Sequence, residues 1–429
     1  MASTGTLTVA CVVLAAGSMA GTALAQTPST ETGRVLIPGA TQEQNVIRVF
    51  GGAVVERHSN IFRLADGTDP TGLFGKSNRA DTLLLGTAGV RFDREFSLQR
   101  VRLEAQLNPV KYFTYSQLDH IGYSGSARWD WAVGSAFYGD LGARLGQLQT
   151  SFIGTTYGGD KNLERRNAVF FTGGVRVTPS WSVFGHVDHE NLDNSLAQSA
   201  FQAANFRATG TEAGVRYEPG TGAEIALLGR HTKATYPNLQ TVDIFGTPIA
   251  TPISNDYKQN AMLVRLQLRP NEDTRIAGDF GYTKREYDSV GSRDFSGPTA
   301  RLGLDWRAGP GFFMATELIR DLTSANILTA NYVDNTELRL RPTFVLTGKI
   351  NLNGSLSYAK VGWKGDPGLV SQTSGYRKDT LIIAGLQLAY EYSRVLTLTA
   401  DVRHEHRDSN FNFADYKNNI FGVGIQARF

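Results

Sequence analysis

Residues 396–403 read Leu-Thr-Leu-Thr-Ala-Asp-Val-Arg, an alternation of apolar and polar side chains with a period of two. Successive side chains of a β-strand point to opposite faces, so such a segment has one apolar face and one polar face. The same alternation recurs along the chain, for example at 101–107, 301–307 and 338–346. A sequence with this period throughout predicts an all-β protein.

The length of these segments and the connections between them favour a membrane barrel over a soluble sandwich. The segments run for about 12–18 residues, whereas strands of soluble proteins usually have about five or six. Short turns such as Pro219–Gly222 alternate with longer, polar, Gly-rich links near 64–78, 154–165, 191–205, 237–254, 288–296 and 364–375. Aromatic residues beside the short turns are typical of the girdle at a membrane interface: Phe92, Trp181, Tyr217, Trp306, Phe312, Phe344, Tyr390 and Tyr392.

We therefore predict a transmembrane antiparallel up-and-down β-barrel of about eighteen strands. The strands are expected at 46–63, 79–94, 98–115, 119–133, 136–153, 166–178, 181–193, 206–218, 222–236, 257–269, 273–288, 297–308, 312–325, 330–347, 350–363, 376–392, 395–409 and 411–429. An even number of strands places both ends of the barrel's polypeptide chain on the periplasmic side, with short turns there and long loops outside. Loops 154–165 and 237–254 are candidates to fold inward and narrow the lumen.

The N-terminus predicts export from the cytoplasm. Residues Leu7 to Leu24 are apolar or small and carry no charge, and the small-residue pattern Ala23-Leu24-Ala25 follows them. This is the pattern of a cleaved secretory signal peptide, although no Lys or Arg precedes the apolar run; an N-terminal membrane anchor is the alternative. We expect a signal peptide at 1–25, a periplasmic leader at 26–45 and an outer-membrane barrel at 46–429. The only cysteine is Cys11, inside the predicted signal peptide, so the mature barrel has no disulfide or cysteine-based site.

Composition and spacing argue against a nucleic-acid partner, a metal site and an enzyme. The formal net charge is +3 and the charges are evenly mixed, with no basic block that would bind nucleic acid. His186 and His189 are three apart and face opposite sides of a strand, whereas His404 and His406 share the apolar face and are expected at the outer rim. Ser124 lacks the spacing of a nucleophile elbow. We expect no catalytic residue, no metal and no cofactor.

The charged face of the strands is the candidate site. An Arg at mid-depth on the lipid side would cost about 2–4 kcal/mol, so these side chains are expected to line an aqueous lumen. They could orient a hydroxyl-rich or anionic polymer through bidentate hydrogen bonds, or they could only form cross-strand ion pairs that stiffen the wall. The candidate pore-lining residues are Arg102, Glu104, Arg216, Arg265, Arg275, Asp279, Arg301, Asp305, Arg339, Arg341, Asp401, Arg403 and Glu405.

The last strand is typical of a barrel that the bacterial barrel-assembly machinery inserts. Its alternate residues from Phe421 to Phe429 share one apolar face, and the chain ends on the aromatic Phe429. Gly424 and Phe429 fit the assembly signal, whereas Ala427 stands where an aromatic is usual. Outer-membrane lipid and the assembly machinery are therefore expected partners.

Several segments resemble the β-barrel porin type 2 family. They are Val46–Gly52 with His58–Arg63, Arg79–Thr82 with Gly89–Phe92, Trp129–Trp131, and the turn at Gly214–Gly220. The resemblance covers nearly all of the expected barrel. It implies an outer-membrane component of exopolysaccharide synthesis and export, with polysaccharide and periplasmic export components as partners. A general or substrate-selective diffusion porin, and a structural barrel whose loops bind surfaces, remain alternatives.

Overall fold

The computed structural model describes residues 46–150, 161–197, 199–220, 222–242, 248–289, 291–327, 330–364, 377–411 and 414–429. The predicted signal peptide and leader, and parts of loops 154–165 and 237–254, lie outside the described residues. Within the described part of the chain, no helix has both the length and the apolar character needed to cross a membrane.

Eighteen long strands form one sheet, which confirms the predicted fold and strand number. The strands are β1 (Val46–His58), β2 (Asp81–Phe96), β3 (Gln99–Tyr112), β4 (His120–Val133), β5 (Phe137–Gln149), β6 (Leu163–Arg176), β7 (Trp181–Asn194), β8 (Phe206–Tyr217), β9 (Glu224–Thr235), β12 (Tyr257–Asn271), β13 (Thr274–Tyr287), β14 (Phe295–Arg307), β15 (Phe312–Ile327), β16 (Ala330–Thr347), β17 (Ile350–Lys364), β18 (Lys378–Glu391), β19 (Leu396–Ser409) and β20 (Tyr416–Arg428). Two further strands, β10 (Gln240–Val242) and β11 (Pro248–Ile253), form a small separate hairpin. Strands this short leave no periodicity to detect in a sequence.

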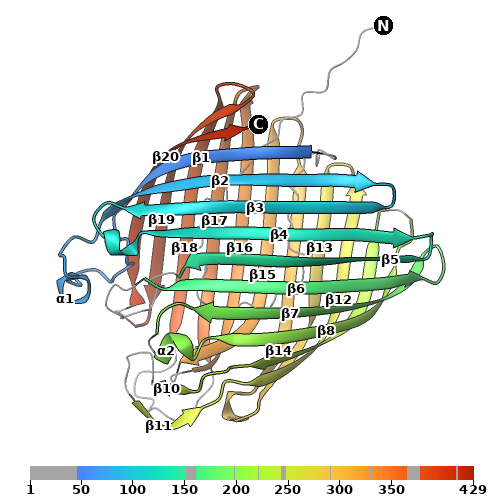
Figure 1. The fold of residues 1–429 in the computed structure, drawn as a ribbon, viewed down its shortest axis with the longest axis horizontal. Coiled ribbons are helices and arrows are strands. Elements are labelled where there is room, and N and C mark those ends of the chain that lie inside the picture. Colours follow the sequence, from blue (N-terminus) through green and yellow to red (C-terminus); the bar gives the residue numbers. More distant parts are fainter. Residues whose placement is uncertain are drawn as a thin grey trace.

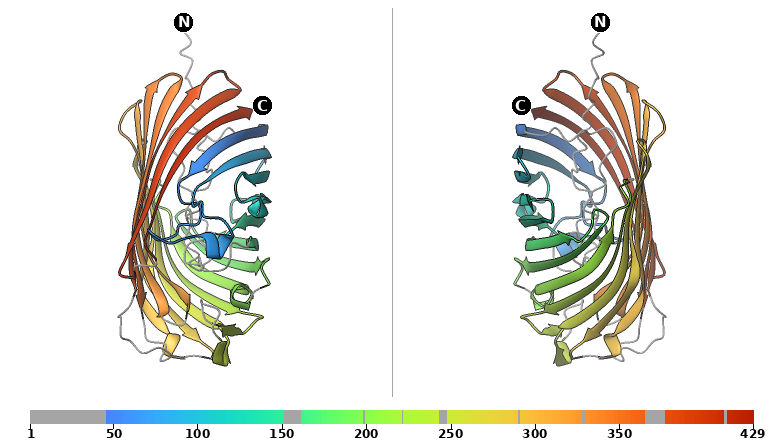
Figure 2. Two further views of the ribbon diagram at one scale, coloured as in Figure 1. Left: turned by 90° about the vertical axis from the view of Figure 1, so that its left-hand side faces the viewer. Right: turned by 90° about the vertical axis from the view of Figure 1, so that its right-hand side faces the viewer.

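Each long strand pairs antiparallel with its neighbours along the chain, and the sheet closes where β1 pairs with β20. Figures 1 and 2 show the near and far walls crossing at a large angle, as strongly tilted strands do in a closed barrel. The closing register runs from Phe50 opposite Arg428 to His58 opposite Ile420. Beyond it, the backbone N–H of Phe429 donates to the carbonyl of Val49 at 2.8 Å, so the last residue belongs to the seam.

The two faces of the wall differ as the alternation predicts. Large apolar side chains on alternate residues are exposed on the outward face; Val423 is 68% exposed and Leu386 is 53% exposed. Polar and charged side chains occupy the positions between them, on the concave inner face. The outward aromatic residues gather beside the short turns, where Trp181 packs on Tyr217 with ring centroids 4.7 Å apart. This arrangement forms the expected girdle at the end of the barrel that carries the turns.

The other end carries the long connections and is called the loop end here. Its short helices are α1 (Thr71–Phe74), η2 (Ser116–Leu118), α2 (Ser199–Gln202) and η3 (Gly291–Arg293). Within the connection at 59–80, Phe62 stacks on Phe74 with ring centroids 3.6 Å apart. Phe62 also meets Tyr115, between β3 and η2, edge-on at 4.7 Å. Figure 2 shows α1 across this end of the ring. A buried cluster of Ile61, Phe62, Phe74, Leu83, Tyr112, Tyr115 and Leu118 holds the connection in place.

Replacing Leu386 by Arg should destabilise the barrel in a lipid bilayer by about 2–4 kcal/mol, because Leu386 lies in the middle of β18 on the lipid face. Replacing its neighbour Gln387 by Arg should cost less than about 1 kcal/mol, because Gln387 points to the polar interior. Reversible chemical unfolding of both variants in liposomes would measure the difference. Equal losses at the two positions would contradict the assignment of the faces.

Candidate functional site

All thirteen predicted pore-lining residues occupy inward positions. The strand registers align them with one another across the wall: Arg102 lies opposite Arg128, Arg265 opposite Asp279, and Gln387 opposite Asp401. Two inward serines on β4, Ser124 and Ser126, are exposed, so this part of the inner wall is open to solvent.

The largest ion-pair network spans β7 to β13 at mid-wall. Glu212 on β8 accepts from Arg230 at 3.0 Å and from Arg265 at 3.4 Å. Arg230 also reaches Asp188 on β7 at 2.7 Å, and Arg265 reaches Asp279 on β13 at 3.0 Å. Each Arg therefore joins two carboxylates from different strands. Convergence of side chains from non-adjacent strands shows that these residues lie on the concave side of the wall.

Gly210 makes the contact between Arg230 and Asp188 possible. Those two residues lie on β9 and β7, and β8 runs between them with Gly210 opposite Asp188. A Cβ atom at Gly210 would meet the Arg230 guanidinium and would lie 2.7 Å from the Asp188 carboxylate. The missing side chain therefore opens the path for an ion pair across the intervening strand.

A second network continues the first across β14 to β16. Arg301 on β14 lies opposite Asp279 and contacts Glu317 on β15 at 3.5 Å. Glu317 also pairs with Arg339 on β16 at 3.2 Å, and Arg339 pairs with Glu337 at 2.6 Å. Cations and carboxylates thus alternate around this half of the inner wall.

A third network lies near the turn end of β2 to β5. Arg100 pairs with Asp93 at 2.8 Å, while Arg102 and Arg128 converge on Asp130. Arg128 continues to Asp140 on β5 at 3.3 Å. The candidate Glu104 pairs with Arg91 at 2.8 Å, but both side chains are substantially exposed.

Some predicted residues are not brought together. Arg275 and Asp305 lie opposite each other in the register, yet no ion pair within 4.0 Å joins them in the described residues. The Asp305 Oδ1 and Arg275 Nη1 atoms are buried without a hydrogen-bond partner there. Arg216 pairs with Glu224 at 3.1 Å, and Arg403 pairs with Glu405 at 3.4 Å.

The loop end adds a contact that the strand pattern could not reveal. Arg63, in the connection after β1, donates to both carboxylate oxygens of Glu405, at 2.8 and 3.2 Å. Glu405 is completely buried, and Asn418 donates to it at 3.3 Å. Burial lowers the pKa of Arg63, but the carboxylate of Glu405 raises it, and the net shift is upward. The pair therefore ties the 59–80 connection to the inside of β19.

Asn60 strengthens the same attachment. Its backbone N–H donates to the Asn418 side chain at 2.9 Å, and its side chain donates to the carbonyls of Leu64 and Lys417. Arg63 itself has a positive φ of 55°, in the region that residues other than glycine rarely adopt. The ion pair and the hydrogen bonds around it hold that backbone turn, which aims the Arg63 side chain at Glu405.

The histidines are placed as their spacing indicates. His186 points inward and contacts Asp188 at 3.3 Å, whereas His189 bonds Thr209 on the outward side. His404 and His406 stack on the outward face with ring centroids 6.4 Å apart. Among the described residues, no group of three or more His, Cys, Asp or Glu side chains could hold a metal ion.

A closed barrel of eighteen strands, with an apolar outer wall and a charged inner wall, defines an outer-membrane, porin-like β-barrel. Residues 275–429 match the family model described as "Putative beta-barrel porin 2". This match confirms the resemblance to the β-barrel porin type 2 family. It rests on the C-terminal part of the barrel, whereas the motifs that suggested the family all precede residue 275.

Solved outer-membrane proteins of Pseudomonas aeruginosa are similar in structure at low sequence identity. A ferric enterobactin receptor, PfeA, is 9% identical, with 90% of this chain and 81% of that chain covered and a TM-score of 0.45. The outer membrane protein OpdK is 11% identical, with 90% and 99% covered and a TM-score of 0.45. OpdL is 11% identical, with 89% and 99% covered and a TM-score of 0.45. No curated protein sequence matches the chain.

Replacing Arg63 by Gln should destabilise the barrel by about 3–5 kcal/mol and free the 59–80 connection, because Glu405 would keep a buried charge without its main partner. The free energy of unfolding and the rate of proteolysis within 64–78 would both report the change. Arg91→Gln is the control, since its exposed pair with Glu104 should contribute at most about 1 kcal/mol. Similar losses in the two variants would show that the Arg63 pair does not hold the connection.

Proposed function

We propose that this barrel is a passive conduit or scaffold for exopolysaccharide secretion across the outer membrane. The observation that carries the proposal is the continuous polar inner wall, built from the ion-pair networks of β2–β5, β7–β13 and β14–β16. A hydroxyl-rich polymer can exchange hydrogen bonds with such a wall at every step. The family's association with exopolysaccharide clusters supports the same role. The drive would come from periplasmic export components, and no catalysis is assigned to the barrel.

A strip of uncharged donors and acceptors complements the ionic networks. Thr343 on β16 donates to Asn353 on β17 at 3.1 Å, and Asn353 reaches Gln387 on β18 at 3.5 Å. Amide and hydroxyl groups offer both donors and acceptors at one position, as sugar hydroxyls do. The strip therefore supports contacts with neutral sugar units, while the arginines and carboxylates support contacts with charged ones.

The position of the 59–80 connection supports a conduit that admits the polymer but limits the passage of small solutes. It crosses from β1 to contact β19 through Arg63, and its Phe62 packs on Tyr115, which lies between β3 and η2. A connection held in this way at the loop end would limit the leak of small solutes when no polymer is present. The same feature would also suit a substrate-selective diffusion porin, which is the second candidate function.

Deletion of the gene should abolish extracellular polysaccharide and leave the uptake of small solutes unchanged, because the conduit would be dedicated to the polymer. Quantification of secreted polysaccharide and of the uptake rate of a labelled monosaccharide would test this, with the wild-type gene in trans as the control. Normal polysaccharide together with slowed uptake would overturn the proposal in favour of the porin. Loss of neither would favour a structural barrel.

A bulky chemical group attached to the inner wall should stop polysaccharide export while the barrel itself stays in the membrane. Ser126→Cys introduces a thiol at an exposed inward position of β4, and the expected mature chain has no other cysteine. Modification with a bulky maleimide should lower polysaccharide release at least about tenfold, in proportion to the labelled fraction. The unlabelled variant is the matched control. Full export from fully labelled barrels would show that the polymer does not pass this wall.

A further inference from the structure

Exposed cations surround the outward face at the loop end. Each occupies an alternate position that continues the lipid-facing side of its strand; they are Arg57, Lys111, Arg165, Arg207, Lys233, Lys258, Lys284, Arg320, Lys360, Lys364, Lys378 and Lys417. Eight of the chain's eleven lysines belong to this set, so lysine is concentrated at one height on one side of the wall. Because the ring lies outside the barrel, a polymer in the lumen would not contact it.

One part of the ring is a basic patch made of Arg207, Lys233, Lys258 and Lys284. Lys233 on β9 lies directly opposite Lys258 on β12, and like charges in such a pair are destabilising. Arg207 is a diagonal neighbour of Lys233, because Thr209, two residues along β8, faces Lys233. Lys284 is likewise a diagonal neighbour of Lys258, because Glu286, two residues along β13, faces Lys258.

Acidic residues neutralise only part of the positive charge of the patch. Lys258 contacts Asp288 at 3.2 Å and Lys284 contacts Glu286 at 2.7 Å, but Lys233 has no ion pair within the described residues. Four cations thus face two carboxylates. An external anion would relieve the repulsion between Lys233 and Lys258.

The patch lies at the edge of the apolar band. Met262 is 60% exposed and lies four residues from Lys258 along β12, about 13 Å toward the middle of the wall. Tyr282 is 55% exposed and lies two residues from Lys284 on β13. The lysine stems can therefore follow apolar surface while their ammonium groups reach the layer of lipid head groups.

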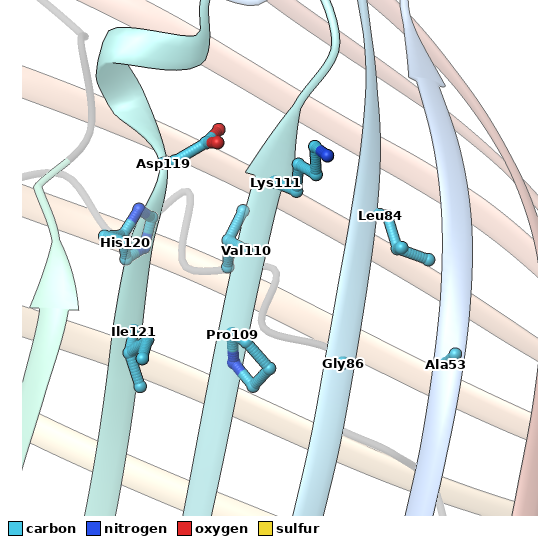
Figure 3. A pocket seen from close by; sticks show the side chains of 9 residues that line it. All are labelled: Ala53, Leu84, Gly86, Pro109, Val110, Lys111, Asp119, His120 and Ile121. Carbon is cyan, nitrogen blue, oxygen red and sulfur yellow. The ribbon is translucent and has the colours of Figure 1, made fainter.

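A groove in the outer wall lies beside another member of the ring. The groove has a volume of about 440 Å³, and its apolar lining is accompanied by three polar residues, Lys111, Asp119 and His120 (Figure 3). The apolar lining residues are Ala53, Leu84, Gly86, Pro109, Val110 and Ile121. Gly86 leaves room for the Pro109 ring, because a Cβ atom there would lie 2.8 Å from the ring. The groove runs along the apolar outer face of β1 to β4, where an acyl chain would pack.

We propose that the ring binds the phosphate groups of a multiply acylated, phosphorylated lipid in the outer leaflet. The basic patch is its principal phosphate site, and the groove beside Lys111 takes an acyl chain. The excess of four cations over two carboxylates in the patch is complementary to phosphate, and the apolar outer wall beside it suits acyl chains; together these features select this occupant. The inference is independent of what passes through the lumen.

The double variant Lys233→Gln/Lys258→Gln should bind bis-phosphorylated, hexa-acylated lipid A about 30-fold more weakly than the wild type, because each cation near an anionic surface contributes a factor of about five. Native mass spectrometry of the detergent-purified barrel, titrated with this lipid, measures the affinity. The wild type should bind dephosphorylated lipid A as weakly as the variant binds the phosphorylated form. An excess of inorganic phosphate should not displace the lipid, since phosphate alone lacks the acyl contacts.

The matched control is Lys349→Gln/Arg394→Gln, which removes two exposed cations from short turns at the opposite end. It should keep wild-type affinity, and unchanged heat-modifiability on gels would show that both variants are folded. Equal binding by the two double variants would overturn the proposal. So would equal affinity of the wild type for phosphorylated and dephosphorylated lipid A.

Discussion

The closing pair of β1 and β20 is the constraint on which the rest of the barrel depends. Hydrocarbon supplies no hydrogen-bond partners, so every backbone N–H and C=O in the wall must be satisfied within the sheet. Eighteen strands meet this requirement only because Phe50–His58 completes the register with Ile420–Arg428. The ladder loses a donor at Pro109 and at Pro342. In each case a glycine on the facing strand, Gly86 or Gly354, lets the ring pack tightly where the pairing is interrupted.

Closure also decides what the inner face can do. On a concave surface, side chains from non-adjacent strands converge, and this convergence allows Glu212 to serve two arginines while Gly210 leaves a passage for Arg230. Buried ion pairs contribute little net stability after the cost of desolvation, but losing one partner is expensive. The networks therefore act mainly on the shape of the wall: they fix the positions of the guanidinium and carboxylate groups that any polymer in the lumen would meet.

The strands and the direction of their side chains follow from the period of two. Residues as far apart as Arg102 and Arg403 could therefore be placed on the inner face of the wall from the sequence alone. The same pattern contains Glu212, Arg230 and Glu317, which the candidate set omitted although they sit at alternating positions. The Arg63–Glu405 pair is different, because it joins residues 342 apart and Arg63 lies in an irregular connection. Arg275 and Asp305 lie opposite each other but form no ion pair within the described residues, because register brings two residues opposite each other without fixing their side-chain rotamers.

In the described strands, lysine is confined to the outward side of the wall, whereas arginine lies on both sides. In the described strands, the cations of the inner ion pairs are arginines, with His58 and His186 beside them, whereas the lysine pairs of Lys258, Lys284 and Lys364 lie on the outward side. Arginine offers a planar fork that can hold two carboxylates at fixed angles, which suits a wall that must keep its shape. Lysine is a flexible point charge on a long apolar stem, which suits a boundary where head groups exchange and shift. The inner wall of the described strands thus takes its organising cations from arginine, whereas lysine is kept for the side that meets the surroundings of the protein.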